Sequence, residues 1–131
     1  MNDNLVTIKT QLQPVFTRFI DKIFFCYCFG SVATDSYSGN SDVDLAFYVH
    51  PDFVNYDFKL TLYADCSRAL KRNDIDIVIL NDLQNLILAE SVVRDGVLLY
   101  ESNPEERLNY EIKTIHNAID FRYQRQLAIG V

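Results

Sequence analysis

The chain has 131 residues, the size of one ordinary domain, and 49% of them are hydrophobic, which is enough to build a core and excludes wholesale disorder. Its formal net charge of −6, from 18 acidic and 12 basic residues, argues against a general nucleic-acid binder, because such proteins carry a basic surface. An acidic balance instead suits a protein that holds cations or docks on a basic partner.

The first residues and the cysteines of the chain indicate its cellular compartment. The polar start of the chain predicts no secretory signal, and no apolar run approaches the roughly 18 residues that cross a bilayer. An odd number of cysteines, namely Cys26, Cys28 and Cys66, predicts reduced thiols. We therefore expect a cytoplasmic protein without membrane contact. The Cys26-x-Cys28 pair lies in an apolar run without a second pair at zinc-finger spacing, so core packing is expected there instead of a metal.

The first half of the chain predicts a helix followed by two strands. Apolar periodicity and turn residues indicate a helix over about 3–20, a strand over 23–29, a loop over 31–41 and a strand over 42–49. Pro14 weakens the helix, since an interior proline removes a hydrogen bond. The first strand runs directly into Gly30-Ser31.

The second half alternates helices with short strands. The expected elements are a helix over about 55–72, a strand over 74–80, a helix over 82–94, a strand over 97–100 and a helix over 104–126. Asn81 or Asp82 is a suitable N-cap for the middle helix, and Gly96 a suitable C-cap. The last helix carries an apolar stripe that we expect to pack on the sheet, with contact to a partner as the alternative: Leu108, Ile112, Ile115, Ile119 and Tyr123.

These elements predict an α/β (α+β) fold in which a small mixed β-sheet of three to four strands is flanked by helices. No linker or repeat divides the chain, so we expect a single domain over 1–131, with its core at about 20–100 and the C-terminal helix at about 104–126.

Two aspartates begin the second predicted strand. Asp42 and Asp44 lie at i and i+2, so their side chains point to one face with Cα atoms roughly 7 Å apart. Carboxylates this close repel each other unless a cation lies between them, and oxygen ligands suit Mg²⁺. The opposite face of this strand is apolar and predicts a core: Val43, Leu45, Phe47 and Val49.

The third predicted strand repeats this arrangement. Asp74 and Asp76 share one face, and isoleucines occupy the other. If the two strands are neighbours, Asp76 can approach Asp42 and Asp44, and three carboxylates around two metal ions suit nucleotidyl transfer. Asp76 could also accept the proton of an attacking hydroxyl.

Gly30-Ser31 completes the pattern. A glycine after a buried strand lets a phosphate approach the backbone, and the following turn offers N–H groups and a hydroxyl. Each motif alone is commonplace, since Gly-Ser is usually a turn and Asp-x-Asp usually a strand end. Their order and spacing on these elements favour a functional site.

Gly30-Ser31, ten intervening residues and then Asp42-Val43-Asp44 resemble the signature of the DNA polymerase beta-like nucleotidyltransferase superfamily. The run FGSVATDSYSGNSDVDLAFYV is similar to that of the minimal nucleotidyltransferases, the MNT subfamily. Asp76-Ile77-Val78-Ile79-Leu80 resembles the strand that bears the third acid of that family, and the resemblance covers about 20–100.

The resemblance implies Mg²⁺ as cofactor, ATP as the nucleoside triphosphate, and a polymerase beta-like fold. It implies Gly30 and Ser31 at the triphosphate, Asp42 and Asp44 on metal, and Asp76 as the third carboxylate. Many MNT proteins are antitoxins that transfer AMP to a tyrosine of a partner HEPN-domain ribonuclease, so we expect the same here, in a hetero-oligomer without direct nucleic-acid binding. The alternatives are an antibiotic nucleotidyltransferase and an antitoxin that only masks its partner.

The chain departs from the family at one place. An arginine and a glycine often follow Gly-Ser shortly, whereas this sequence reads Val32-Ala33-Thr34-Asp35. One cation fewer near a triphosphate weakens charge neutralisation. Arg68, Lys71, Arg72 or a basic residue of a partner are candidates to compensate.

Overall fold

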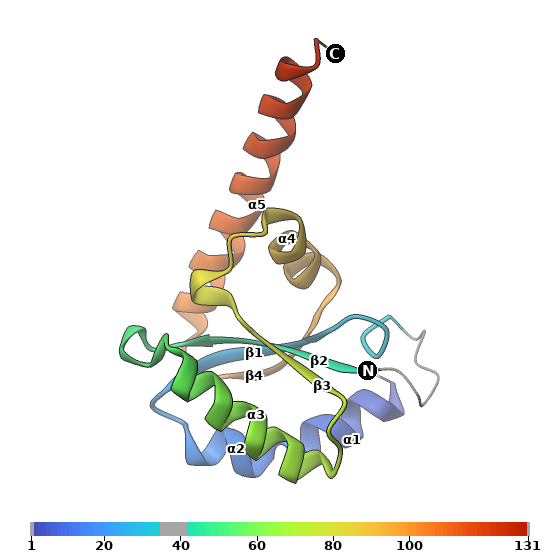
Figure 1. Cartoon of the computed structure of the whole chain (residues 1–131), viewed down its shortest axis with the longest axis vertical. Coiled ribbons are helices and arrows are strands. Elements are labelled where there is room, and N and C mark those ends of the chain that lie inside the picture. Colours follow the sequence, from blue (N-terminus) through green and yellow to red (C-terminus); the bar gives the residue numbers. More distant parts are fainter. Residues whose placement is uncertain (1, 35–41, 131) are drawn as a thin grey trace.

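The fold is built on one mixed sheet, seen edge-on in Figure 1. The structure is a computed structural model that describes residues 2–34 and 42–130. The strands are β1 (Ile23–Phe29), β2 (Val43–Val49), β3 (Ile75–Ile79) and β4 (Val97–Glu101). They are arranged in the order β3-β2-β1-β4, with β1 antiparallel to both β2 and β4 and with β2 parallel to β3. The expected mixed sheet flanked by helices is confirmed.

Helices cover both faces of the sheet. In Figure 1, α1 (Asp3–Gln11), α2 (Gln13–Arg18) and α3 (Tyr56–Leu70) lie below it, and α4 (Leu86–Asp95) and α5 (Pro104–Ala128) lie above. Two short 3₁₀ helices, η1 (Pro51–Phe53) and η2 (Leu80–Asp82), follow β2 and β3. None of the helices in residues 2–34 and 42–130 is long and apolar enough to cross a membrane.

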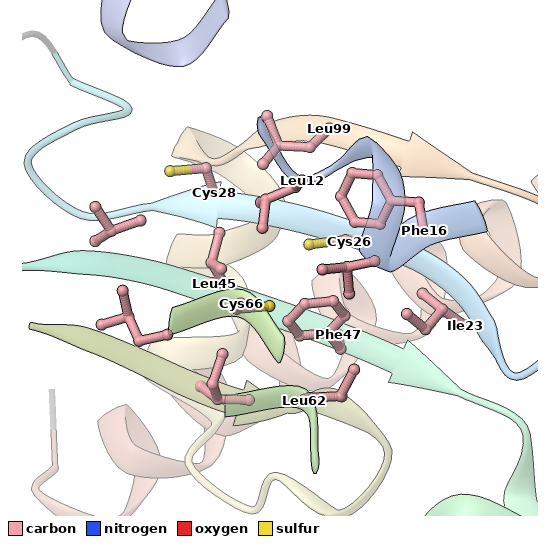
Figure 2. Packing of buried hydrophobic residues seen from close by; sticks show 14 of the residues in the cluster. Leu12, Phe16, Ile23, Cys26, Cys28, Leu45, Phe47, Leu62, Cys66 and Leu99 are labelled. Atoms are coloured by element: carbon pink, nitrogen blue, oxygen red, sulfur yellow. The ribbon is translucent and has the colours of Figure 1, made fainter. Parts of the chain in front are cut away.

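The main core lies between the sheet and the layer of α1, α2 and α3. Figure 2 shows Leu45 and Phe47 of β2 packed among Phe16, Leu62 and other side chains from these helices. All four predicted core residues of β2 are 0% exposed, which confirms the period-two pattern. The cysteines are free thiols buried in the same core, as predicted for Cys26 and Cys28.

The predicted first helix is divided in two. α1 ends at Gln11 and α2 begins at Gln13, with Leu12 between them and Pro14 in the first turn of α2. A proline is tolerated there because the N–H groups of the first turn have no partner within the helix. The weakness that Pro14 indicated is therefore a helix boundary.

The N-cap predicted for the helix at 82–94 was wrong. α4 begins at Leu86, and its N-cap is Asn85, whose side chain accepts a hydrogen bond from the Leu88 N–H at 3.0 Å. Asn81 instead bonds the end of β2, where its side chain accepts from the Val49 N–H at 2.9 Å and donates to the Val49 carbonyl at 2.7 Å. This side chain extends the pairing of β3 with β2 beyond the last residue of β3. Gly96 closes α4 as predicted.

The packing predicted for the stripe on the last helix was also wrong. Its five residues are between 43% and 62% exposed. The buried side of α5 carries Thr114 and Ala118, and Arg122 donates to Glu90 of α4 at 2.7 Å. The first half of α5 turns Tyr110 and Thr114 toward the sheet instead of the stripe, and the second half extends well beyond the sheet (Figure 1).

We expect Asn81→Ala to lower the free energy of unfolding by about 1–3 kcal/mol, since it removes two hydrogen bonds from the Val49 backbone. Urea denaturation measures this change. Asn109→Ala on the exposed side of α5 is the control and should change the value by less than about 0.5 kcal/mol. Equal effects of both substitutions would contradict a structural role for Asn81.

Candidate active site

Three aspartates lie where β2 and β3 begin. Asp44 and Asp76 are direct partners in the parallel register of these strands, and Asp42 immediately precedes β2. Neighbouring strands lie about 4.8 Å apart, so the two paired residues present their side chains side by side. The two acid-bearing strands are neighbours, which is the condition under which Asp76 was expected to approach Asp42 and Asp44, and backbone pairing sets this arrangement.

The sheet face that carries the aspartates is open at its acidic end and covered at its other end. Along β2, Asp42 is exposed and Asp44 is half-buried, while Ala46 is buried and the Tyr48 ring lies 5.2 Å from the Tyr110 ring of α5. The helices α4 and α5 therefore cover the far half of the face. Solvent and ligands can reach the carboxylates at the near end.

The charges of these carboxylates act on one another. Burial raises the pKa of Asp44 above its ordinary value, and the negative charges of Asp76 and Asp42 raise it further. Ionising all three carboxylates at once is thus opposed by their mutual repulsion. A cation bound among them would relieve this repulsion.

The donor set suits a hard cation, but the side chains do not converge on one point. In the part of the chain that the structure describes, no group of three His, Cys, Asp or Glu side chains is arranged to hold a metal ion. The oxygen-only set of Asp42, Asp44 and Asp76 is the kind that Mg²⁺ prefers. Because Asp42 and Asp76 are exposed, their side chains have room to turn toward Asp44.

Gly30 lies directly against this acidic cluster. β1 ends at Phe29, which is paired with Asp44, and Gly30 follows with φ 76° in the left-handed region. A Cβ atom on Gly30 would lie 2.2 Å from Oδ2 of Asp44. Both the backbone conformation and the close carboxylate require glycine, so the Gly-Ser turn and the aspartates form one packed unit.

The turn after β1 is fixed by its own hydrogen bonds. The Ala33 N–H and the Thr34 hydroxyl donate to the Gly30 carbonyl at 3.2 and 3.3 Å. The side chain of Val32 is fully buried, and its carbonyl accepts from the Asn2 amide at 3.2 Å. Ser31 is half-buried within this turn. The family arginine is thus replaced by residues that anchor the turn, and Asp35 lies outside the described residues.

The cations proposed from sequence lie elsewhere or already pair with acids. Arg68 pairs with Asp65 at 3.3 Å, on the helix that covers the opposite face. Arg72 donates to Asp74 at 2.5 Å, just before β3. Lys71 is exposed and ends α3 in the left-handed conformation. Neither of these two ion pairs joins a cation to Asp42, Asp44 or Asp76.

A cavity of about 620 Å³ adjoins Asp76 and contains a cation that sequence reasoning missed. Its walls come from the start of α3, from β3 and from the segment after η2: Asn55, Tyr56, Lys59, Asp76–Ile79 and Asp82–Gln84. Lys59 is the cation. It belongs to no motif, and its place is apparent once the sheet order puts β3 at the edge.

Several solved structures share this fold. A toxin–antitoxin with AMP-PNP matches with a TM-score of 0.77 at 24% identity, over 93% of this chain and 95% of that chain. The structure of a tri-AMPylated Shewanella oneidensis HEPN toxin in complex with MNT antitoxin matches with a TM-score of 0.73 at 22% identity, over 96% of each chain. A toxin–antitoxin MntA-HepT matches with a TM-score of 0.70 at 24% identity, over 94% of each chain.

No curated protein matches the chain. The family model described as polymerase beta, nucleotidyltransferase matches residues 10–105, a range that contains β1 to β4 and all three aspartates. With the paired aspartates and the Gly-Ser turn placed as above, the chain belongs to the polymerase beta nucleotidyltransferase family.

Proposed function

We propose that this protein is a cytoplasmic antitoxin that transfers AMP from ATP to a tyrosine hydroxyl of a HEPN-domain ribonuclease toxin and thereby neutralises it. The observation that carries the proposal is the pairing of Asp44 with Asp76 against Gly30, at the mouth of a cavity. Two similar structures support the choice of substrates, one a toxin–antitoxin with AMP-PNP and the other an MNT antitoxin with an AMPylated HEPN toxin.

Each element of the site has a role in this reaction. The turn at Gly30 and Ser31 holds the triphosphate through backbone N–H groups and the serine hydroxyl. Asp42, Asp44 and Asp76 hold Mg²⁺, which when bound supplies the positive charge that the triphosphate and the carboxylates both need. Asp76 accepts the proton of the tyrosine hydroxyl. The phenolic oxygen then bonds to the α-phosphorus as the bond from that phosphorus to the β-phosphate oxygen breaks, and pyrophosphate leaves.

The product explains how the toxin would be silenced. A neutral hydroxyl becomes a bulky anionic phosphodiester. Beside an RNA-cleaving site this group repels the RNA backbone and blocks its approach. The net charge of −6 also suits docking on a basic RNA-binding protein, because complementary charge steers association.

A second function, masking without chemistry, is favoured by two observations. The carboxylates do not converge as placed, and Ser31 is followed by Val32, Ala33 and Thr34 instead of an arginine. Masking needs binding alone, whereas transfer needs an intact site.

Co-expression with the cognate HEPN toxin separates these functions. We expect the toxin to gain the mass of one or more AMP units, measured by intact-mass spectrometry, and to lose its ribonuclease activity. Asp42→Asn or Asp44→Asn in the antitoxin should abolish the mass gain. A toxin that is silenced but unmodified would exclude the transfer reaction and leave masking.

Asp44→Asn should lower transfer at least a hundredfold without loss of stability. Burial and the charges of Asp76 and Asp42 disfavour ionised Asp44 in the folded chain, so a neutral side chain relieves repulsion. Without added divalent cations, we expect a thermal midpoint equal to or above that of the wild type. Asp120→Asn on the exposed part of α5 makes the same charge change away from the site and should leave transfer unchanged. A folded, active Asp44→Asn variant would refute the assigned role.

Substitution of Asp76 should affect the transfer rate much more than substitution of Asp74, although the two residues share a strand face. Asp76→Asn should lower the transfer rate on the order of a hundredfold or more, as expected for the loss of a general base. Asp74→Asn should change it little, because Asp74 is exposed and is hydrogen-bonded by Arg72. Steady-state rates with saturating ATP provide the comparison. The reverse order of effects would place the third acid two residues earlier.

A further inference from the structure

The cavity next to Asp76 follows the outer edge of the sheet. β3 is the last strand in the order β3-β2-β1-β4, and among the described residues no strand pairs with it on the side away from β2. Figure 1 shows β3 crossing the front of the sheet, with α3 below it and the segment leading to α4 above. The groove, defined as the 620 Å³ cavity between these two walls, therefore has the outer edge of β3 as its floor.

Backbone groups on this floor point into the groove. The Val43 N–H donates to the Asp74 carbonyl at 3.0 Å, so the backbone of Asp74 faces β2. Because N–H and C=O groups alternate sides along a strand, Asp76 and Val78 also face β2, whereas Ile77 and Ile79 face outward. Ile77 and Ile79 are 3% and 8% exposed as whole residues and both line the cavity, so their side chains are buried and a bound segment would meet their main chain.

The edge of β3 lacks two of the features that commonly keep another strand from pairing, a proline and a bulge. Sheet edges are commonly blocked by a proline, a bulge or an inward-pointing charge. The segment Ile75–Ile79 contains no proline, and its register with β2 is regular over all five residues. Asp76 lies at the start of this edge and also in the carboxylate cluster, so the groove is continuous with the proposed active site.

We propose that an extended segment of the acceptor protein binds in this groove as an additional strand on β3, with main-chain hydrogen bonds to Ile77 and Ile79. This inference rests on the proposed function and adds to it the mode in which the acceptor binds. Strand addition gives affinity through the main chain and leaves alternate side chains to determine specificity. Lys59, exposed on the wall that α3 contributes, can donate to a carbonyl or carboxylate of the segment.

Strand spacing then favours tyrosine as the acceptor. A strand added to β3 lies about 4.8 Å from Asp76 and about twice that distance from Asp44. A residue paired opposite Asp76 points its side chain to the same face as the carboxylates. A serine or threonine hydroxyl at this position would reach Asp76 but not Asp44, which lies one strand farther. The longer side chain of tyrosine can cross β3 and bring its oxygen between Asp76 and Asp44.

Hydrogen exchange tests the added strand directly. The full chain carrying Asp44→Asn, which halts transfer, is mixed with the cognate HEPN toxin and followed by amide exchange with NMR detection. We expect the exchange of the Ile77 and Ile79 amides to slow at least tenfold on binding. The amides of Asp76 and Val78 are the matched control: they already bond β2 and should change much less. Unchanged exchange at Ile77 and Ile79 in a formed complex would overturn the proposal.

A substitution in the groove wall tests whether the groove binds the acceptor independently of the nucleotide site. Gln84→Trp places a bulky ring on the groove wall and should raise KM for the toxin at least tenfold while KM for ATP stays unchanged. Gln11→Trp, on α1 under the opposite face, should change neither constant. If the toxin is modified with an unchanged KM in Gln84→Trp, the groove is not the acceptor site although the proposed function stands. If wild-type protein leaves the toxin unmodified, the proposed function itself fails.

Discussion

The parallel pairing of β2 with β3 holds the site together, because it sets Asp44 beside Asp76 at neighbouring positions of the sheet. Parallel neighbours require a crossover, and α3 provides it while covering the opposite face. Its buried Leu62 and Cys66 pack against that face, and the burial of one such leucine contributes about 1.5–3 kcal/mol. Apolar packing on one side of the sheet thus offsets the repulsion between carboxylates on the other.

A second constraint connects the Gly-Ser turn to the same pair. Since β1 pairs with β2 so that Phe29 lies opposite Asp44, the residue after β1 must lie against the Asp44 carboxylate. The space there has no room for a Cβ atom, and the chain must turn with a positive φ. One register therefore determines where the Gly-Ser turn lies relative to the acids. A shift of β1 by one residue would separate the turn from the cluster.

Sequence patterns correctly predicted features that depend on local periodicity. They failed for features that depend on contacts between segments far apart in the sequence. Alternation along β2 identified Val43, Leu45 and Phe47 as core, because a strand buried on one face shows this pattern. Asn81 has the chemistry of an N-cap, yet its side chain completes a pairing with Val49, 32 positions away in sequence. The apolar stripe of α5 has helical spacing, but spacing does not reveal that another face of the helix meets the sheet or that the helix continues past it. Lys59 carries no local signal, since its position depends on β3 being the edge strand.

One face of the sheet packs into the core, and the other face carries the candidate active site. The face under α1, α2 and α3 is filled mainly by apolar side chains that form the larger core cluster. On the other face α5 covers Tyr48 and leaves Asp42 and Asp44 within reach of solvent. Those carboxylates repel an incoming triphosphate unless cations accompany it, so in an acidic protein the nucleotide and its cations must bind together. In the proposed binding mode the acceptor would avoid this restriction, because it would approach along the outer edge of β3, where Lys59 lies.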